Sequence, residues 1–517
     1  INSLDLKLIG FLQEKGKLDL ADSDQLFGRS SNSLKRHMMN INLHLPDDKQ
    51  LRIEKNTIIS QLKYNDYIDF VSNLQLEHYI SSQKERIAAI IVFSFFYPIL
   101  NVSKLYEKMG MSLTTKKKDN KALTEYLNKR NLRFEVVPKK GMKVAGSERS
   151  YRILTASILV SLVEIDSAGN LMNRKANNPL QKMIFEVFAE MAKVDIAEAK
   201  DILNKFIKEN QVRMSYPSKK FCLLCLVLSL YRFRQGYMLE AEMELDLKVP
   251  NYQLFINQKR ENLFFTYLAA SLDYMSFSPP PMDTRLKIAV LAFINQVQDH
   301  IVTTFYDYEA IFNEVYSYIY KCYIRNKLDY NLYDKKLDDT HKVLPKLYRT
   351  VSKATPIIET KMDVQFSKLQ ISALTLLVRK FTMKNKVIGR NSRKIVIVSN
   401  SAIEKTSYFA ENLRHHLDVT VAGTYNINEL YELEHIEYDL IITFSNRIAA
   451  LLAENSYSCV KLNFYLNQRD IDKLLKIGFS SSSRRKILSD HFIDEIKDKD
   501  PEEIKELLLT KYPSHFL

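Results

Sequence analysis

Lysine and hydroxyl side chains cluster between residues 112 and 121 in a spacing that suits contact with a nucleic-acid duplex. Ser112 is a favoured N-cap residue and precedes a run of helix formers, so a helix is expected to begin there. The side chains expected in its first turns are Thr114, Thr115, Lys117, Lys118 and Lys121. In a major groove, such side chains reach base edges and flanking phosphates. We therefore interpret Ser112 and these five residues as candidate DNA contacts.

The segment before Ser112 has the features of the first helix of a helix-turn-helix motif. Leu105, Tyr106 and Met109 are apolar and follow a helical spacing, and Gly110 is suited to end that helix. A short helix, a glycine turn and a second helix with polar first turns make up this DNA-binding motif. The order of the chain therefore places the candidate contacts at the start of a recognition helix.

A β-hairpin is predicted after the recognition helix. Residues 132–137 alternate like a strand, and residues 142–145 return as a second strand after a turn. We interpret this hairpin as a wing. Its lysines, Lys139, Lys140 and Lys143, are expected to face the DNA backbone.

The net charge of the chain is concentrated in this region. Residues 103–149 contain 13 Lys and Arg against 5 acidic residues, a difference of +8, whereas residues 1–102 carry 12 of each. A clustered basic face is typical of nucleic-acid binding, because each cation that neutralises a phosphate releases a counterion. A solvated lysine-rich helix is the alternative. The coincidence of charge, helix start and wing favours double-stranded DNA as a partner.

A shorter copy of the same motif is expected near the N-terminus. Residues 5–14 and 21–27 form helical patterns, and Leu34, Met38 and Ile41 recur at helical spacing in a third. That spacing turns four further candidate DNA contacts to the open side: Asn32, Ser33, Lys35 and Arg36.

The two copies align with an offset of 82 residues when Ser30 is set against Ser112 (112 minus 30). Residues 50–60 alternate as the candidate wing of the first copy. In this alignment Lys116 takes the place of the apolar Leu34, so its stem must extend to bring the charge to the surface. Two winged helix-turn-helix units in tandem are thus predicted.

The length and composition indicate a folded, multidomain chain. Its 517 residues correspond to roughly three to five domains, and 46% hydrophobic residues with only 11 Gly point to a mostly helical fold. The longest nearly apolar runs, residues 87–100 and 221–231, are shorter than the about 20 residues of a bilayer span. Without a signal-peptide pattern, the chain is expected in the cytoplasm, with no membrane partner.

Two helical bundles are predicted beyond the second winged unit. Their helical patterns cover residues 155–165, 179–191, 197–209, 219–234 and 258–274, then 284–300, 308–326, 335–352 and 364–383. Pro279, Pro280 and Pro281, after Ser278, separate the two groups, because consecutive prolines cannot continue a helix.

The last part of the chain changes to an alternation of strands and helices. Apolar strands are expected at 394–399, 419–422, 439–444 and 459–462, with helices at 402–416 and 427–433. Such alternation is typical of a small parallel α/β sheet. Residues 480–485 are expected to form a polar linker and residues 501–511 a terminal helix.

The predicted fold class is therefore mainly α and multidomain. It comprises tandem winged helix-turn-helix units, two helical bundles and a small C-terminal parallel α/β domain. The expected domain bounds are 1–62, 63–150, 151–277, 282–388, 392–480 and 481–517.

The four cysteines do not indicate a disulfide framework or a zinc site. Cys222 and Cys225 form a Cys-x-x-Cys pair, but they lie in the apolar run FCLLCLVLSLY, which favours two small side chains in a buried helix. We expect no metal and no cofactor. Paired carboxylates, a nucleophile elbow and a glycine-rich phosphate loop are also missing from the sequence, so an enzyme is not predicted.

The order of these parts resembles the Mga and AtxA type of transcription regulators, with the RofA-like proteins close by. Residues 141–152 resemble the wing end and the Glu-x-x-x-Arg join of that family, with Glu148 and Arg152 at the two ends. Residues 221–236 and 333–351 are similar to its central helix and the following segment. The resemblance implies two phosphotransferase-system regulatory domains and a terminal phosphotransferase IIB-like module.

The sequence departs from that family at the regulatory residues. The resemblance implies phosphorylated histidines seven residues before the arginine that ends each central helix, but Cys225 and Tyr318 occupy these positions. The cysteine of a IIB-type module is likewise replaced by residues 399–401, Ser-Asn-Ser. We therefore predict regulatory domains without the usual acceptors, unless His300 or His341 has taken over.

These features together predict a DNA-binding transcription regulator, a global or virulence-type activator linked to carbohydrate status. The expected partners are double-stranded DNA, a second copy of the chain in a dimer or larger assembly, and phosphotransferase-system proteins. The alternatives are a phosphotransfer module and a protein-binding scaffold without a direct role on DNA.

Overall fold

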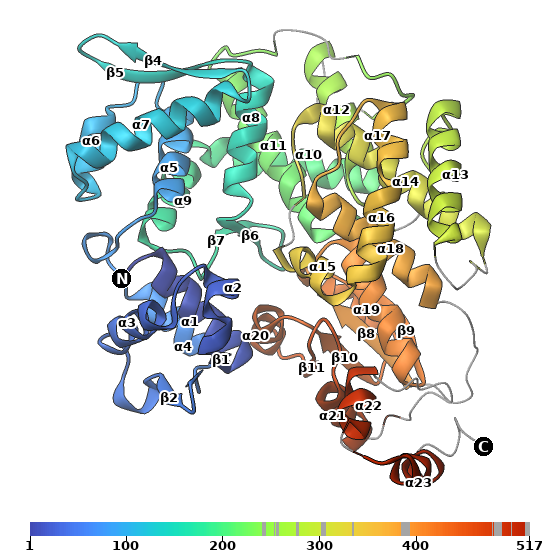
Figure 1. Ribbon diagram of the computed structural model, residues 1–517. Coiled ribbons are helices and arrows are strands. Elements are labelled where there is room, and N and C mark those ends of the chain that lie inside the picture. The colour runs from blue at the N-terminus through green and yellow to red at the C-terminus, as the bar shows by residue number, and fades with distance from the viewer. Residues whose placement is uncertain are drawn as a thin grey trace.

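The computed structural model shows a mainly α-helical, multidomain chain, as predicted (Figure 1). The structure describes residues 1–239, 244–252, 254, 258–275, 279–300, 305, 307–332, 335–383, 393–477, 479, 489–497 and 499–511. Among the helices of these ranges, none combines the length and the apolarity that a bilayer crossing requires. The predicted linker at 480–485 lies outside the described residues.

The first winged unit has the helices and the wing expected for residues 1–62. Its elements are α1 (Ser3–Lys15), β1 (Lys17–Asp19), α2 (Ser23–Phe27), α3 (Ser31–Asn42), β2 (Arg52–Glu54) and β3 (Thr57–Ile59). The strands form an antiparallel sheet in the order β1-β3-β2. α3 begins where predicted, because the Ser30 side chain accepts a hydrogen bond from the Ser33 N–H. α4 (Tyr64–Ser72) then leads out of the unit.

The second winged unit repeats this order of elements. It consists of α5 (Gln83–Phe96), α6 (Val102–Lys108), α7 (Leu113–Asn128), β4 (Leu132–Val137) and β5 (Gly141–Gly146). Leu100 pairs with Met142 on β5 through N–H···O distances of 2.8 and 3.0 Å, so it takes the place of β1. The close approach of the Leu100 backbone to β5 requires glycine at position 141, because a Cβ atom on Gly141 would lie 2.5 Å from the Leu100 carbonyl oxygen.

Helices form the middle of the chain. The first group is α8 (Glu148–Leu159), α9 (Pro179–Met191), α10 (Lys193–Glu209), α11 (Tyr216–Arg234) and α12 (Lys259–Ser271). The second group is α13 (Thr284–Asp299), α14 (Tyr308–Leu328), α15 (Thr340–Val343), α16 (Pro345–Ala354), α17 (Pro356–Met362) and α18 (Lys368–Met383).

Two helix predictions for this region were wrong in detail. The helix expected at 155–165 ends at Leu159, and the chain continues as a hairpin of β6 (Val163–Ile165) and β7 (Leu171–Asn173). The helix expected at 335–352 is interrupted before Pro345, which has no N–H for the preceding turn. The predicted boundary at residue 150 falls inside α8, which therefore joins the second winged unit to the first helical group.

The C-terminal region contains the predicted parallel sheet. Its strands are β8 (Arg393–Val398), β9 (Val419–Tyr425), β10 (Leu440–Thr443) and β11 (Cys459–Lys461), in the order β11-β10-β8-β9. All three described pairings are parallel. The accompanying helices are α19 (Ile403–His416), α20 (Asn446–Glu454) and α21 (Gln468–Lys476), and α22 (Ser489–Ile496) and α23 (Pro501–Lys511) follow.

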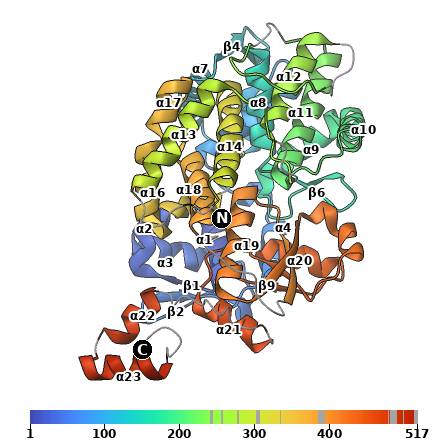
Figure 2. The ribbon, with the colours of Figure 1, turned by 90° about the vertical axis from the view of Figure 1, so that its right-hand side faces the viewer.

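The terminal sheet domain lies below the helical groups and contacts several other parts of the chain (Figures 1 and 2). α19 packs against α18, and Arg447 at the start of α20 forms an ion pair with Glu164 of the β6–β7 hairpin. Asn446 contacts Gln13 of the first winged unit at 3.4 Å. The domain therefore bridges the first winged unit and both helical groups.

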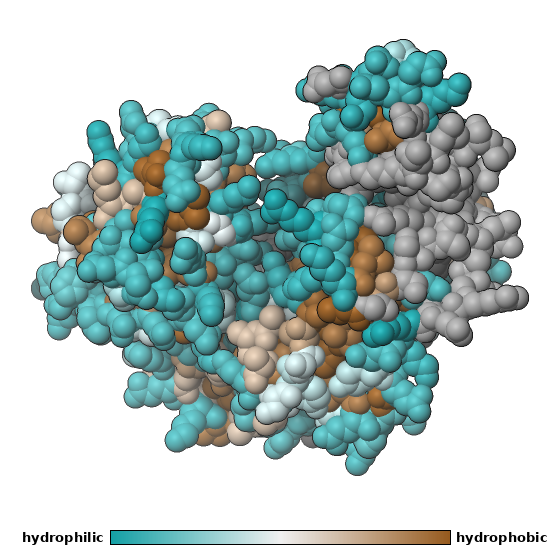
Figure 3. Space-filling model, turned by 90° about the horizontal axis from the view of Figure 1, so that it is seen from below, coloured by the Kyte–Doolittle hydropathy of each residue, from teal (hydrophilic) through white to brown (hydrophobic). Residues whose placement is uncertain are grey.

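The two winged units differ in how their cores join the rest of the chain. The buried apolar residues of the first unit, from Leu6 to Tyr79, form a separate cluster. Those of the second unit continue into the helical groups and the terminal sheet as one cluster. Seen from below, the surface is mainly hydrophilic, with apolar side chains gathered near the centre and in smaller groups at the left (Figure 3). The second unit is thus built into the body of the protein, and the first is docked onto it.

Candidate nucleic-acid interface

The outer face of α7 is polar and basic. Thr114, Lys117, Lys118 and Lys121 are exposed, while Leu123 and Leu127 on the opposite face are fully buried. α7 and the β4–β5 wing lie at the upper left edge of the molecule, away from the terminal domain (Figure 1). The predicted lysines of α7 are therefore exposed on the outer face of the helix.

The hydroxyl residues at the start of α7 have a structural task. The Ser112 side chain accepts a hydrogen bond from the Thr115 N–H at 3.2 Å, and the two hydroxyl oxygens are 3.0 Å apart. Lys116 is half-buried, and its Nζ donates to the Ser103 Oγ at 2.6 Å, as its extended stem requires. These contacts determine the start and the facing of the helix, and so aim Lys117 and Lys118 outward.

A buried carboxylate joins α7 to the helices behind it. Asp119 accepts hydrogen bonds from Arg86 Nε at 2.6 Å, Tyr106 Oη at 2.7 Å and Gln83 Nε2 at 3.0 Å. Burial opposes ionisation of Asp119, but these donors outweigh it and hold its pKa below the ordinary value. Asp119 is not among the predicted contacts, although its position four residues before the buried Leu123 indicates the inner face of the helix.

The wing lysines occupy two kinds of position. Lys139 and Lys140 are exposed in the turn between β4 and β5. Lys143 is exposed on β5, and its Nζ lies 3.4 Å from a carboxylate oxygen of Glu135, its partner across the ladder. A surface ion pair of this kind contributes little, at most about 1 kcal/mol. Lys143 can therefore exchange Glu135 for a phosphate at low cost.

The recognition helix of the first unit is anchored in a similar way. His37 Nδ1 lies 2.7 Å from a carboxylate oxygen of Asp5, which is fully buried on α1, and Asn40 donates to the same carboxylate at 3.0 Å. His37 is 82 residues before Asp119, so the two side chains occupy equivalent positions on the recognition helices α3 and α7. Of the predicted contacts, Asn32 and Arg36 are exposed, and Ser33 and Lys35 are half-buried.

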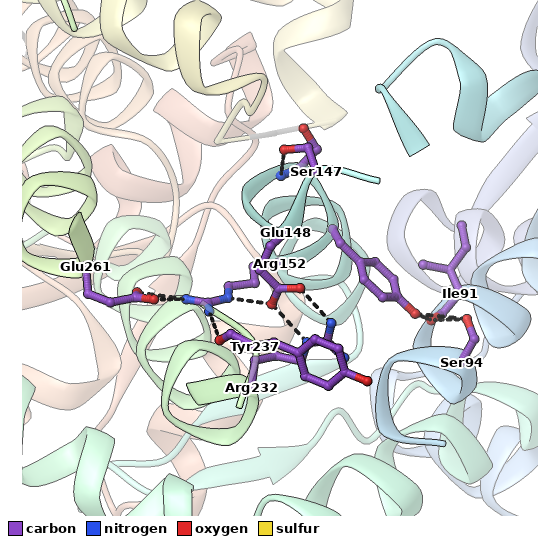
Figure 4. Close-up of polar contacts among 10 residues, drawn as sticks. Ile91, Ser94, Ser147, Glu148, Arg152, Arg232, Tyr237 and Glu261 are labelled. Atoms are coloured by element: carbon purple, nitrogen blue, oxygen red, sulfur yellow. Dashed lines mark hydrogen bonds and ion pairs between the residues drawn. The ribbon is translucent and has the colours of Figure 1, made fainter. Parts of the chain in front are cut away.

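A buried network of four charges joins α8, the helix that continues from the second winged unit, to α11 and α12 of the first helical group (Figure 4). Glu148 on α8 accepts hydrogen bonds from Arg152 Nε at 2.8 Å and from Arg232 Nη2, on α11, at 2.6 Å. Arg152 also donates to Glu261 on α12 at 2.7 and 2.8 Å, and to the Tyr237 carbonyl oxygen at 2.9 Å. The Glu-x-x-x-Arg pair, Glu148 and Arg152, is thus the centre of the contact between these helices.

The carboxylates of this network differ in their environment. Burial opposes ionisation of Glu148, but the hydrogen bonds and charges of Arg232 and Arg152 lower its pKa below the ordinary value. Burial raises the pKa of Glu261 above its ordinary value, with Arg152 acting against it. The Arg232 guanidinium also lies 3.5 Å from the ring centroid of Tyr237. Glu148 is therefore the residue that holds the two arginines together.

The two helical groups are joined by a second buried arginine, Arg325. Its Nη2 lies 2.8 Å from an Asp273 carboxylate oxygen, and Lys321 Nζ lies 2.6 Å from the same oxygen. Burial opposes ionisation of Asp273, but these cations hold its pKa below the ordinary value. Arg325 lies in the last turn of α14 and Arg232 in the last turn of α11, so an arginine near the end of each central helix ties that helix to an element earlier in the chain.

The positions that the resemblance assigns to phosphohistidines are inaccessible. Cys225 and Tyr318 are buried, and the Tyr318 hydroxyl donates to the Gln370 carbonyl oxygen at 2.9 Å. Burial raises the pKa of Cys225 well above its ordinary value, and Cys222 is buried beside it as predicted. His300 and His341 are exposed.

The loop after β8 is held by its own polar contacts. The Ser399 Oγ accepts a hydrogen bond from the Ser401 N–H at 3.1 Å, and the Asn400 side-chain oxygen accepts one from the Ile427 N–H at 3.1 Å. These side chains stabilise the loop in the place where the resemblance implies a reactive cysteine.

Comparison with known families gives two matches. Residues 69–158 match the Mga helix-turn-helix domain, and residues 291–381 match the PRD domain. No curated protein matches the chain at a significant level. The first match contains the whole of α7 and the wing, and the second lies within the second helical group. The resemblance to an Mga-type regulator with PRD regulatory domains is thereby confirmed, and both families are regulatory rather than catalytic.

Proposed function

We propose that this chain, which carries an Mga helix-turn-helix domain and a PRD domain, is a transcription activator that binds double-stranded DNA through both winged units. The observation that carries the proposal is the outer face of α7. Lys117, Lys118 and Lys121 project from a helix whose start is capped by Ser112 and whose inner face is anchored by Asp119. The contact residues we propose are those predicted on α3, α7 and the β4–β5 wing.

Contacts from lysine to phosphate position a protein on DNA but carry no sequence information. A single winged unit is therefore expected to bind weakly. Two units in one chain raise the affinity through effective concentration, and a dimer or larger assembly raises it again by engaging two half-sites. We propose that the helical and terminal domains support that assembly and link it to carbohydrate status through phosphotransferase-system proteins. In this proposal the terminal domain is a IIB-like module.

Binding to a labelled mixed-sequence duplex, measured by fluorescence anisotropy over a series of salt concentrations, tests the proposal. Each phosphate contact is expected to contribute a slope of about −0.9 in the logarithm of affinity against the logarithm of salt concentration. A full-length chain that uses both units should therefore show a steep negative slope. A flat response to salt contradicts the proposal.

Phosphate transfer offers a second test. We expect no stoichiometric phosphorylation when the chain is incubated with phosphotransferase-system proteins and labelled phosphoenolpyruvate. The reason is that the buried Cys225 and Tyr318 stand where the acceptor histidines are implied. Mass spectrometry of the labelled protein measures the result, with a PRD protein that retains its histidines as the positive control. Full labelling of His300 or His341 would show that another acceptor has replaced the implied ones.

The two alternatives make different predictions. A protein-binding scaffold does not require the exposed lysines of α7, so replacing them with neutral residues would leave the binding of its partner protein unchanged. A phosphotransfer enzyme requires a reactive group in the terminal domain. The loop at residues 399–401 presents instead a serine and an asparagine that are engaged in backbone hydrogen bonds.

A further inference from the structure

The outer face of α3 carries apolar side chains where the outer face of α7 carries lysine. Met39 and Leu43 are 62% and 82% exposed. They continue the line of Asn32 and Arg36, because residues at i, i+4, i+7 and i+11 share one face of a helix. α3 lies on the left-hand side of the molecule (Figure 1).

Met39 lies within the part of α3 that can reach base edges. Asn32, Lys35, Arg36 and Met39 follow the spacing i, i+3, i+4 and i+7. The recognition helix of a homeodomain reads bases with side chains at this spacing. Leu43 lies one turn further on, at the C-cap of the helix, and is therefore more distant from the floor of a groove.

The second unit lacks this apolar position. With the offset of 82 residues, Met39 corresponds to Lys121 and Leu43 to Glu125. The exposed large apolar residue of α7 is Leu113, its first residue, which lies one turn before Lys117 and two turns before Lys121. The two units thus present different chemistry at equivalent places: ammonium groups on α7, and a thioether beside basic groups on α3.

Met39 has basic side chains in the same unit as well as the apolar Leu43 one turn further on. Arg36 precedes Met39 by one turn, and Arg52 and Lys55 are exposed on the wing of the same unit. A major groove has the complementary arrangement, because phosphates line its edges and thymine C5-methyl groups are the apolar feature of its floor. An apolar protein partner would leave these charges without a counterpart.

We propose that Met39 contacts thymine C5-methyl groups in the major groove, so that the first unit prefers A·T base pairs and the second mainly contacts phosphates. This inference rests on the proposed DNA-binding function. It assigns sequence preference to a side chain that has no polar group and is not among the predicted contacts.

Uracil substitution tests the proposal directly. The full-length chain is titrated with an A·T-rich duplex and with the same duplex in which deoxyuridine replaces thymidine. The two probes have the same charge and the same Watson-Crick groups, and differ in the C5-methyl. The chain is expected to bind the thymine duplex more tightly, by about fourfold for each methyl group contacted.

The variant Met39→Ala is expected to bind both duplexes equally. The control variant is Met282→Ala, which removes the same atoms from a methionine that is 52% exposed in the loop before α13 and should keep the preference. Equal binding of both duplexes by the unmodified chain, or a preference that survives Met39→Ala, overturns the proposal. Failure of the unmodified chain to bind either duplex overturns the proposed function instead. A change in oligomeric mass on Met39→Ala with an unchanged preference identifies the face as a contact between copies and also overturns the proposal.

Discussion

Replacing Lys117, Lys118 and Lys121 together with alanine is expected to lower the affinity for duplex DNA by on the order of 100-fold near physiological salt. Each lysine that leaves a phosphate removes about 0.9 from the salt slope, so the slope should become shallower by about 2.7. The loss should be similar on all sequences, because phosphate contacts do not distinguish bases. Anisotropy titrations at several salt concentrations measure both quantities.

Folding of the variant is not expected to suffer. The three side chains are exposed, and alanine has a higher helix propensity than lysine. A matched control is available in α10, where Lys193, Lys205 and Lys208 are also exposed. Figure 2 shows α10 at the right-hand side and α7 at the left. Alanine at the three α10 positions removes the same net charge, and we expect its effect on the slope to be small. Equal losses in the two variants would mean that net charge, and not the α7 face, governs binding.

Replacing Arg232 with alanine is expected to destabilise the contact between α8, which continues from the second winged unit, and α11 of the first helical group by about 3 to 5 kcal/mol. The reason is that Glu148 would keep its charge in a buried place with only Arg152 as a partner. Hydrogen exchange measured on peptides from α8 and α11 reports this loss. Protection there should fall by roughly two to four orders of magnitude, at about 1.4 kcal/mol for each factor of ten.

The control for this variant is Arg133→Ala. The Arg133 side chain on β4 is 70% exposed and pairs with Glu135 at the surface, so its loss should cost less than about 1 kcal/mol. Comparable exchange rates in α8 and α11 for Arg232→Ala and the unmodified chain would show that the charge network does not stabilise the contact between these helices. In that case the apolar packing between α8 and α11 is sufficient.

The elements of the candidate interface could be predicted because their signals are local. Ser30 and Ser112 cap helices within three residues, and a positive-φ Gly110 separates α6 from α7. The wrong prediction at 155–165 had the opposite cause. The apolar run there fits a helix or a strand equally well. Contacts with Tyr216 favour the hairpin, because the Tyr216 hydroxyl accepts a hydrogen bond from the Ile165 N–H, 51 residues away in the sequence.

The sequence by itself determined that α7 begins after its N-cap Ser112 and that Lys117, Lys118 and Lys121 are exposed on it, because helix caps and the 3.6-residue period act over a few residues. Only the tertiary structure decided what holds that helix in place and how the winged units are joined to the rest. Asp119 meets Arg86 across 33 residues, and Arg152 meets Glu261 across 109. Pairing between distant charges depends on the packing of whole helices, and no local pattern in the chain specifies it.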